Sequence, residues 1–407
     1  QTVLEQVRSQ PDQDFARAWS AVHNPIQNLG PTMISLANDN RKYIVGREGA
    51  IFFDLHDRPD DPRGARPGTI YQMSYSLPWS CSPTFGSGKD LKITRHLEGE
   101  WLPIPVTTTT DGPVKYRQAA YVVPMSDPLP DAPFWYRDYA MCVADYQAKN
   151  TGTAPAPVKV VLGFGNPADK PIQFQNAKEG LLIIQGDRIV ALIDTRQSAP
   201  LSVKQEGNGV VFSGDLPAGD SARYFVSLPA WKVDPTTYAS LLVDDGTETR
   251  VENYWTTLFE PAMQIEIPDP FLSSIIRASQ VHCLMASRNE NRGAMISPWV
   301  SGAQYGPLES ESNPIIRGLD MTGHTDYARR ALDFMLSFCN QQGFITTGYT
   351  VVGTGQTLWT LAEYYQRSHD RAWLQQVAPE VVRICQWIAR QREKTKRLDA
   401  RGQKVPE

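Results

Sequence analysis

The chain has 407 residues and a formal net charge of −4, with 41% hydrophobic and 21% charged residues. This length fits two or three domains rather than one small core. The small negative charge disfavours a nucleic-acid partner, which needs a clustered basic face, and no apolar run approaches the ~20 residues of a membrane helix, so no membrane partner is expected either.

The cysteines and histidines predict neither a disulfide framework nor a metal site. Five cysteines are scattered in mostly apolar surroundings, which favours buried free thiols. No histidine has a second His or Cys at ligand spacing, so no metal is expected. P-loop, dinucleotide and GxSxG sequences are absent, so no cofactor is expected. The start at Gln1 rather than Met is compatible with a removed leader, and hence with secretion or export, or with trimming.

The first half of the chain predicts an antiparallel β-sandwich. Residues 1–25 hold a short amphipathic helical segment that Pro11 interrupts. Residues 26–232 then read as repeated short strands separated by turn signals. Two of these signals, Gly186-Asp187 and Asn208-Gly209, are dipeptides that tolerate the positive φ of a hairpin turn. Regular short strands of this kind indicate a sandwich and not βαβ units.

The second half switches to helical spacing. Residues 233–265 read as a connecting helix, and residues 266–407 as further helices. Asp269 and Pro270 predict the start of the first of these, with Leu272, Ile275 and Ile276 on its buried face. The next helix is expected over 325–338, with Tyr327, Ala331, Phe334, Met335 and Phe338 on its buried face. Further helices are expected over 354–368 and 378–395, the last opened by Pro379. Arg317 and Asp320 are expected to pair within one helix.

The stretch from Ser297 to Trp359 alternates these helices with long polar loops, and long ordered loops usually carry function. Glu309 and Glu311 lie just before a helix begins. If the segment is extended they share a side, with Cα atoms ~7 Å apart. Inverting hydrolysis of a glycosidic bond uses two carboxyl groups ~6.5–9.5 Å apart, one as acid and one as base. The alternative is that both acids only cap the helix and complement its dipole.

Aromatic residues in or beside the same loops suit a sugar, because pyranose faces stack on flat rings. The candidates for such stacking are Trp299, Tyr305, Tyr349 and Trp359. Gly353 and Gly355 would let the backbone approach a ligand closely. The alternatives are packing in the base of the loop and an ordinary helix start.

These residues carry a family resemblance. A sandwich, a connecting helix ending in NYWTTLF, and the motifs IPDPFL, PWVSGAQYGPLESES and GFITTGYTVVGTGQTLWTLAEYY make the chain similar to the six-hairpin glycosidase superfamily. The nearest likeness is to processing α-glucosidases, glycogen-debranching glucosidases and disaccharide phosphorylases. The resemblance implies a multidomain α and β protein, in which an N-terminal antiparallel β-(super)sandwich is followed by the first helices of an (α/α)6 toroid. The toroid is then incomplete, and a further chain segment or a partner completes it.

The resemblance also transfers site residues. In the family, the loop before the second toroid helix carries an Arg-Asp pair that grips the sugar. Here Glu309 and Glu311 take that place and the Arg is absent. Gln356 and Trp359 match the loop that opens the fourth helix and touches the substrate. The family's catalytic acid follows the fifth or sixth helix, so the second catalytic carboxylate is expected beyond Glu407.

The sequence therefore favours a glycoside hydrolase-like, carbohydrate-active enzyme that hydrolyses an oligosaccharide or a glycoside with inversion. A glycoside phosphorylase is the first alternative, although no Arg/Lys cluster for phosphate is visible in residues 297–361. A non-catalytic carbohydrate-binding or structural protein that retains the fold is the second.

Overall fold

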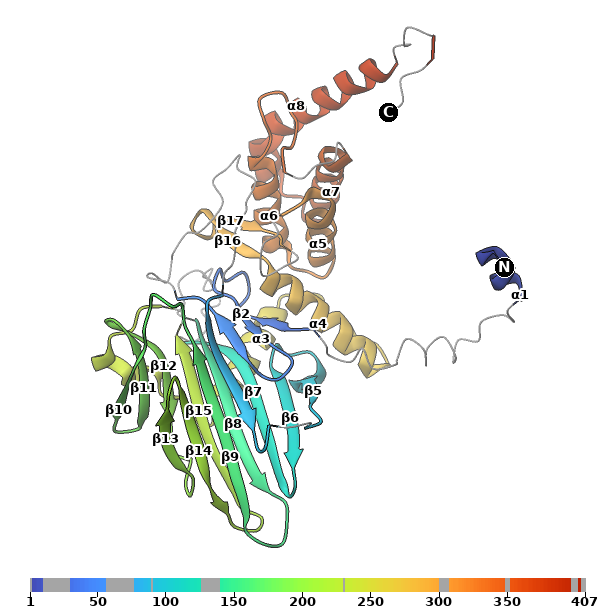
Figure 1. The fold of residues 1–407 in the computed structure, drawn as a ribbon. Helices are drawn as coiled ribbons and strands as arrows, with labels where there is room; N and C mark the ends of the chain where they lie inside the picture. The colour runs from blue at the N-terminus through green and yellow to red at the C-terminus, as the bar shows by residue number, and fades with distance from the viewer. Residues whose placement is uncertain are drawn as a thin grey trace.

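In the computed structural model, two antiparallel sheets are followed by a group of helices (Figure 1). The residues that it describes are 2–9, 30–55, 77–88, 91–125, 140–229, 231–299, 307–347, 352–396 and 402–403. This order confirms the expectation of sheets first and helices after. The domain boundaries at 25, 232 and 265 stay a prediction, because the first of them lies outside the described residues and the others are not tested by the order of elements.

Within the described residues, one sheet has seven strands in the order β1-β2-β3-β4-β9-β14-β13. Its strands are β1 (Thr32–Ile34), β2 (Tyr43–Val45), β3 (Ile51–Phe53), β4 (Trp79–Phe85), β9 (Ala156–Gly165), β13 (Ser202–Glu206) and β14 (Gly209–Leu216). The other sheet has eight strands in the order β10-β11-β12-β15-β8-β7-β6-β5. Its strands are β5 (Thr94–Leu97), β6 (Pro105–Asp111), β7 (Val114–Pro124), β8 (Ala140–Asn150), β10 (Gln173–Ala177), β11 (Gly180–Gln185), β12 (Arg188–Asp194) and β15 (Ser221–Pro229).

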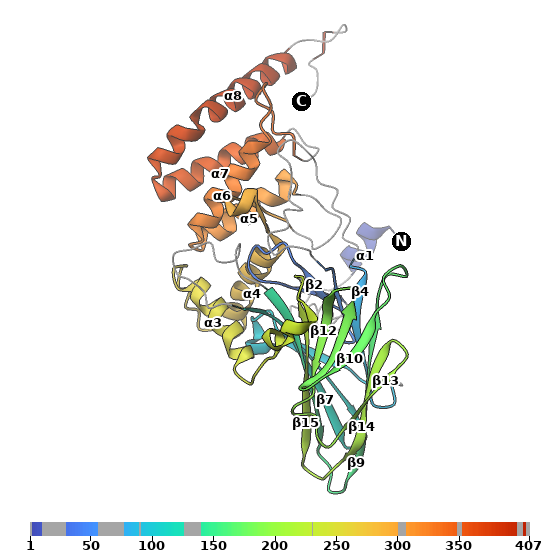
Figure 2. The ribbon, with the colours of Figure 1, turned by 90° about the vertical axis from the view of Figure 1, so that its left-hand side faces the viewer.

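The two sheets pack face to face (Figure 2). Aromatic rings from both sheets make contacts between them. Phe212 on β14 stacks on Tyr224 of β15 with ring centroids 3.7 Å apart. Phe85 on β4 approaches Tyr116 of β7 at 5.6 Å. Both contacts join one sheet to the other, so the core of the sandwich lies between them.

The predicted hairpin turns are present, one of them shifted by a residue. Gly186-Asp187 joins β11 to β12, and Gly186 has a φ of 60°. The second turn is formed by Gly207 and Asn208, with Gly207 at a φ of 57°, because Gly209 already pairs with Glu206. The expected Asn208-Gly209 turn is therefore wrong by one position, since either glycine can supply the positive φ.

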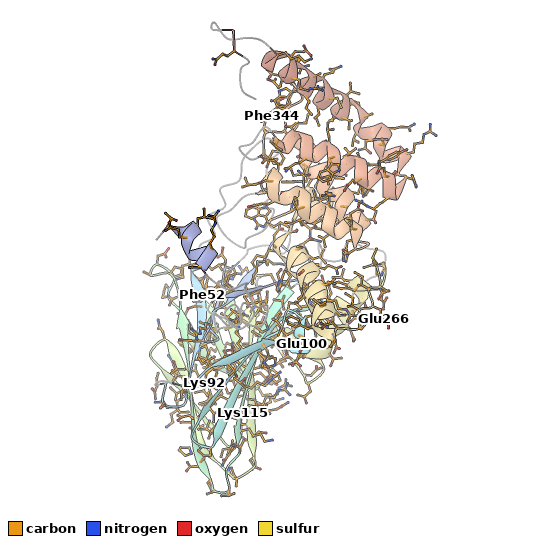
Figure 3. The ribbon with its side chains drawn as sticks, turned by 90° about the vertical axis from the view of Figure 1, so that its right-hand side faces the viewer. Phe52, Lys92, Glu100, Lys115, Glu266 and Phe344 are labelled. Atoms are coloured by element: carbon orange, nitrogen blue, oxygen red, sulfur yellow. The ribbon has the colours of Figure 1, made fainter. Side chains whose placement is uncertain are left out.

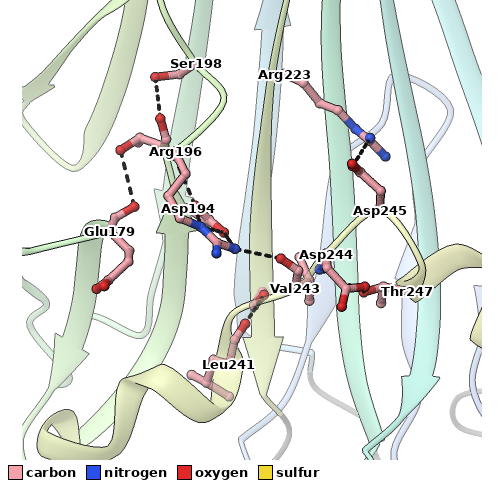
Figure 4. Close-up of polar contacts among 12 residues, drawn as sticks. Glu179, Asp194, Arg196, Ser198, Arg223, Leu241, Val243, Asp244, Asp245 and Thr247 are labelled. Atoms are coloured by element: carbon pink, nitrogen blue, oxygen red, sulfur yellow. Dashed lines mark hydrogen bonds and ion pairs between the residues drawn. The ribbon is translucent and has the colours of Figure 1, made fainter.

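The connecting segment is tied to the eight-stranded sheet. It comprises the 3₁₀ helix η3 (Pro235–Leu241) and helix α3 (Thr247–Phe259). Arg196 donates to the Val243 carbonyl at 2.7 Å and Arg223 pairs with Asp245 at 2.5 Å (Figure 4). Charged hydrogen bonds of this kind orient the segment that leads into the helices.

The helical region contains α4 (Pro270–Ala286), α5 (Glu309–Met321), α6 (Thr325–Ser337), α7 (Val352–Ser368) and α8 (Arg371–Thr395). A short hairpin, β16 (Arg288–Glu290) and β17 (Met295–Ser297), follows α4, and α1 (Val3–Ser9) lies at the N-terminus. Three 3₁₀ turns complete the described elements: η1 (Glu98–Glu100), η3 and η4 (Asn291–Gly293). Asp269 caps α4 by accepting from the amides of Phe271 and Leu272, as predicted.

Helices α5 and α7 lie side by side, and α6 follows α5 and precedes α7 in the chain (Figures 1 and 2). The two helices run in the same direction, because their first turns are in contact and so are their later turns. Arg317 of α5 pairs with Glu363 of α7 at 2.5 Å, and one turn later Asp320 accepts from Arg367 at 2.7 Å. The expected pair between Arg317 and Asp320 is therefore wrong. Each of the two residues pairs with an oppositely charged residue on α7. The spacing of charges along one helix does not reveal a partner on another helix.

Two other helical expectations are corrected. Leu272 and Ile275 are exposed, together with Phe271, because α4 packs through its C-terminal half, where Val281, Leu284 and Met285 are buried. Helix α8 begins at Arg371, with Asp370 as its cap, so Pro379 lies inside it. A proline there loses one backbone hydrogen bond but does not prevent the helix.

The segment between α6 and α7 contacts α8 through Phe344 (Figure 3). The ring centroid of Phe344 lies 4.9 Å from that of Trp387 in α8. The predicted buried face of α6 is confirmed, since Tyr327, Ala331, Phe334 and Met335 are all buried. Across the described ranges, no helix has both the length and the apolar content that crossing a bilayer requires.

Candidate functional site

The N-terminal ends of α5 and α7 meet, and Glu309 lies between them. Its side chain is 1% exposed. A Cβ placed on Gly353 would lie 1.5 Å from Cγ of Glu309, so only glycine fits opposite this carboxylate. The close approach that Gly353 permits is therefore to Glu309, while Gly355 faces open space.

Polar side chains hold the two helix starts in register. Asn313 on α5 donates to the carbonyl of Glu309 at 2.8 Å and to the hydroxyl of Thr357 on α7 at 3.3 Å. Thr357 in turn donates to the Gly353 carbonyl at 3.1 Å. All four residues are buried, and hydrogen bonds in such surroundings specify one arrangement of the helices.

Three chain segments converge on this end of the helices. Ser312 donates to the Pro298 carbonyl at 3.1 Å, which attaches the segment after β17 to α5. Thr347 donates to the Pro307 carbonyl at 2.6 Å, which attaches the segment before α7 to that before α5. The sequence interpretation missed Asn313 and Thr357. Polar residues on the buried faces of amphipathic helices were the signal that could have found them.

The expected geometry of Glu309 and Glu311 is wrong in one respect. Both residues lie in the first turn of α5, not in an extended segment before it. Side chains two positions apart on a helix do not face each other. Glu309 is buried against α7 and Glu311 is half-buried, so the two acids do not form a side-by-side pair. The nearness of two acids in sequence could not distinguish these environments.

The aromatic candidates have different surroundings. Trp299 is buried, its indole N–H donates to Ser297 at 2.6 Å and the Arg288 guanidinium lies 5.0 Å from its ring centre, so it offers no open stacking face. The expected stacking of a sugar on Trp299 is corrected, because its ring packs against neighbouring parts of the same chain. Tyr305 and Tyr349 lie outside the described residues.

Trp359, in the second turn of α7, is 53% exposed. The Arg317 guanidinium covers one face of its ring at 3.8 Å from the centre. The hydrogen bond from Arg317 lowers the pKa of Glu363, which keeps that ion pair charged. Gln356, in the first turns of α7, is half-buried, and among the described residues its side-chain oxygen has no hydrogen-bond partner.

Comparison with known proteins shows a likeness to solved structures but not to known sequences. No family model matches the chain, and no curated protein matches it. The fold is similar to that of a bacterial glucoamylase solved in complex with acarbose, at 9% identity and a TM-score of 0.49. The similarity covers 84% of this chain and 56% of the glucoamylase chain, so this chain spans little more than half of that protein's length.

A groove of about 1480 Å³ lies elsewhere, along α6. Its walls come from the end of α3, Asn38, the β16–β17 hairpin and the start of α8, and it includes none of Glu309, Glu311, Gln356 or Trp359. Among the described residues, no cluster of three or more His, Cys, Asp or Glu side chains is arranged to hold a metal ion. The candidate site is therefore assigned from side-chain chemistry and convergence of segments, not from cavity size.

Proposed function

We propose that this chain belongs to a carbohydrate-active enzyme that hydrolyses a glycoside or an oligosaccharide with inversion, at the end where α5 and α7 begin. The observation that carries the proposal is that two parallel helices bring an acidic first turn, at Glu309 and Glu311, and an amide, at Gln356, to one end of the helical region. The motif resemblance of residues 297–361 supports the same reaction class.

We assign different roles to the two acids. Glu311 is half-buried and lies at the helix end where the segments before and after it converge. It is therefore the carboxylate that contacts the sugar, and it is one of the two carboxyl groups that inversion needs. Glu309 is enclosed between α5 and α7, so it holds the first turn of α5 in place. Gln356 and the open face of Trp359 are the proposed additional sugar contacts.

The proposed architecture around the site is a helical toroid. In this arrangement α5 and α7 are consecutive inner helices, and α4, α6 and α8 are outer ones. This arrangement is supported by the side-by-side pairing of α5 with α7 through Asn313–Thr357, Arg317–Glu363 and Asp320–Arg367. In such a toroid the inner helices of successive hairpins are neighbours and run in the same direction.

One observation favours a second candidate, a non-catalytic carbohydrate-binding protein. Burial of Glu309 leaves Glu311 as the more accessible of the two acids in the first turn of α5. A site with a single accessible carboxylate can hydrogen-bond a sugar but lacks the acid and base pair of hydrolysis.

Substitution of the two acids tests the proposal. The chain and its Glu311→Gln, Glu309→Gln and Glu393→Gln variants are assayed on a panel of aryl glycosides and oligosaccharides, with binding followed by calorimetry. Loss of a general acid or base typically lowers turnover by ~10²–10⁴-fold, and this is expected for Glu311→Gln. Glu309→Gln should lower the melting temperature, and the exposed Glu393 is the control. Unchanged turnover in Glu311→Gln would refute the assignment. Sugar binding without any turnover by the product of the complete gene, which would include any residues after Glu407, would favour the second candidate.

A further inference from the structure

A loop of the sandwich, residues 35–42 between β1 and β2, reaches the helical region and contacts the end of α4. The amide of Asn38 donates to the Leu284 carbonyl at 2.8 Å, and the Asn38 carbonyl accepts from the amide of Asn289 at 2.8 Å. The side chain of Asn40 donates to the Asn289 carbonyl at 3.1 Å. This loop is therefore hydrogen-bonded to β16, the strand that follows α4.

Lys42 anchors the loop on the C-terminal end of α4. Its ammonium group donates to the carbonyls of Met285 and Ser287, the latter at 3.0 Å, and to Ser35 at 3.4 Å. A cation is favourable at a helix C-terminus, where carbonyls lack partners within the helix. Lys42 is 4% exposed. Burial, with Arg288 nearby, lowers the pKa of Lys42, and the charge of Asp39 opposes this shift.

The loop has an internal ion pair and is also joined to the connecting helix. Arg41 and Asp39 form a buried ion pair within it, with Nε of Arg41 2.7 Å from the carboxylate. The amide of Ala37 donates to the Tyr254 hydroxyl of α3 at 3.1 Å. Hydrogen bonds and ion pairs are directional, so these buried contacts favour one geometry of the loop.

Contacts continue from this loop to the candidate site. Arg288 of β16 donates to the Asn40 carbonyl at 3.3 Å, and its guanidinium lies over the ring of Trp299. The neighbouring Pro298 carbonyl accepts from Ser312 in the first turn of α5, beside Glu311. Each step is a direct contact, so a continuous path of contacts joins the loop to that turn.

We propose that Lys42 and Asn40 are positioning residues through which the sandwich sets the orientation of the first turn of α5, and thereby of Glu311. The inference rests on the proposed function only for its consequence on turnover; the coupling of the loop to α5 is independent of it. The sandwich is then part of the working site and not only a neighbouring domain.

The experiment compares Lys42→Met, Lys42→Arg and Asn40→Ala in the 407-residue chain. Amide hydrogen exchange is measured in residues 288–299 and 307–316, with β9 as the internal reference. Loss of a charged hydrogen bond is expected to raise exchange in both segments by about tenfold or more in Lys42→Met, without change in β9. Lys42→Arg should restore part of the protection, because it keeps the cation.

Arg196→Met is the matched control. It also breaks a polar link between the sandwich and the connecting segment, but that link does not touch the 35–42 loop (Figure 4). It should leave exchange in residues 307–316 unchanged. If Lys42→Met does not fold, Asn40→Ala, which removes one neutral hydrogen bond, takes its place.

Turnover separates this inference from the proposed function. Misplacement of a reacting group by 1 Å can lower turnover by roughly 100-fold. On a glycoside that the wild-type chain hydrolyses, Lys42→Met should therefore lower kcat far more than it changes KM. Unchanged exchange in residues 307–316 in both Lys42→Met and Asn40→Ala would overturn the positioning role, whatever the turnover. Raised exchange in Lys42→Met, together with no hydrolysis of any glycoside by the product of the complete gene, would sustain the coupling and refute the enzyme assignment.

Discussion

In the sandwich, β8 and β15 bury most of their side chains on both faces, whereas in the helical region α4 leaves Phe271, Leu272 and Ile275 exposed and α5 meets α7 through polar pairs. Apolar burial is non-directional, so it stabilises the sandwich without selecting partners one by one. Hydrogen bonds and ion pairs are directional, so they set which turn of α5 faces which turn of α7. The difference indicates that stability resides mainly in the sandwich and that site geometry depends on polar contacts.

The largest effect should come from the core of the sandwich. Phe212→Ala removes a ring stacked 3.7 Å from Tyr224, and we expect the free energy of unfolding to fall by about 3–5 kcal/mol, measured by urea titration. Phe52→Ala is the control, since Phe52 lies on the outer face of the same sheet at 38% exposure (Figure 3). Equal losses in the two variants would contradict the view that burial between the sheets supplies the stability.

A smaller loss, confined to the helical region, should follow a single added methyl group. Gly353→Ala places a Cβ on Glu309 and should destabilise the α5–α7 pair by about 1–3 kcal/mol, the usual effect of overpacking. Gly355→Ala, two residues later and facing open space, should instead stabilise the helix by about 0.5–1 kcal/mol. Thermal unfolding of both variants measures the difference. A Gly353→Ala protein as stable as Gly355→Ala would show that Glu309 is not enclosed there.

The smallest effect concerns pH. Burial lowers the pKa of His324, at the start of α6 beside Gln280 and Phe259, from 6.5 to about 4. Since the unfolded chain binds the proton more readily, this residue's contribution is complete above pH 6.5 and is lost as the pH falls towards 4. His324→Asn removes the titration. The stability gap between wild type and variant should shrink by about 1–2 kcal/mol between pH 7.5 and 5 in urea titrations, and parallel profiles would contradict it.

The sequence predicted the features that depend on neighbouring residues. The Asp269 cap, the hairpin at Gly186-Asp187, the buried face of α6 and the change from strands to helices all follow from backbone preference or local periodicity. Such signals act over a few residues, so tertiary contacts reinforce them without altering them.

Only the tertiary structure decided which surfaces meet. Periodicity marks an apolar face on α4 but not whether another element covers it, and charge spacing on α5 cannot show that Arg317 and Asp320 have partners on α7. The burial of Glu309 and Trp299 is likewise set by residues distant in the chain, Gly353 for the first and Arg288 for the second. The sequence can thus nominate acids and aromatic rings for a site, whereas the accessibility of their side chains depends on long-range packing.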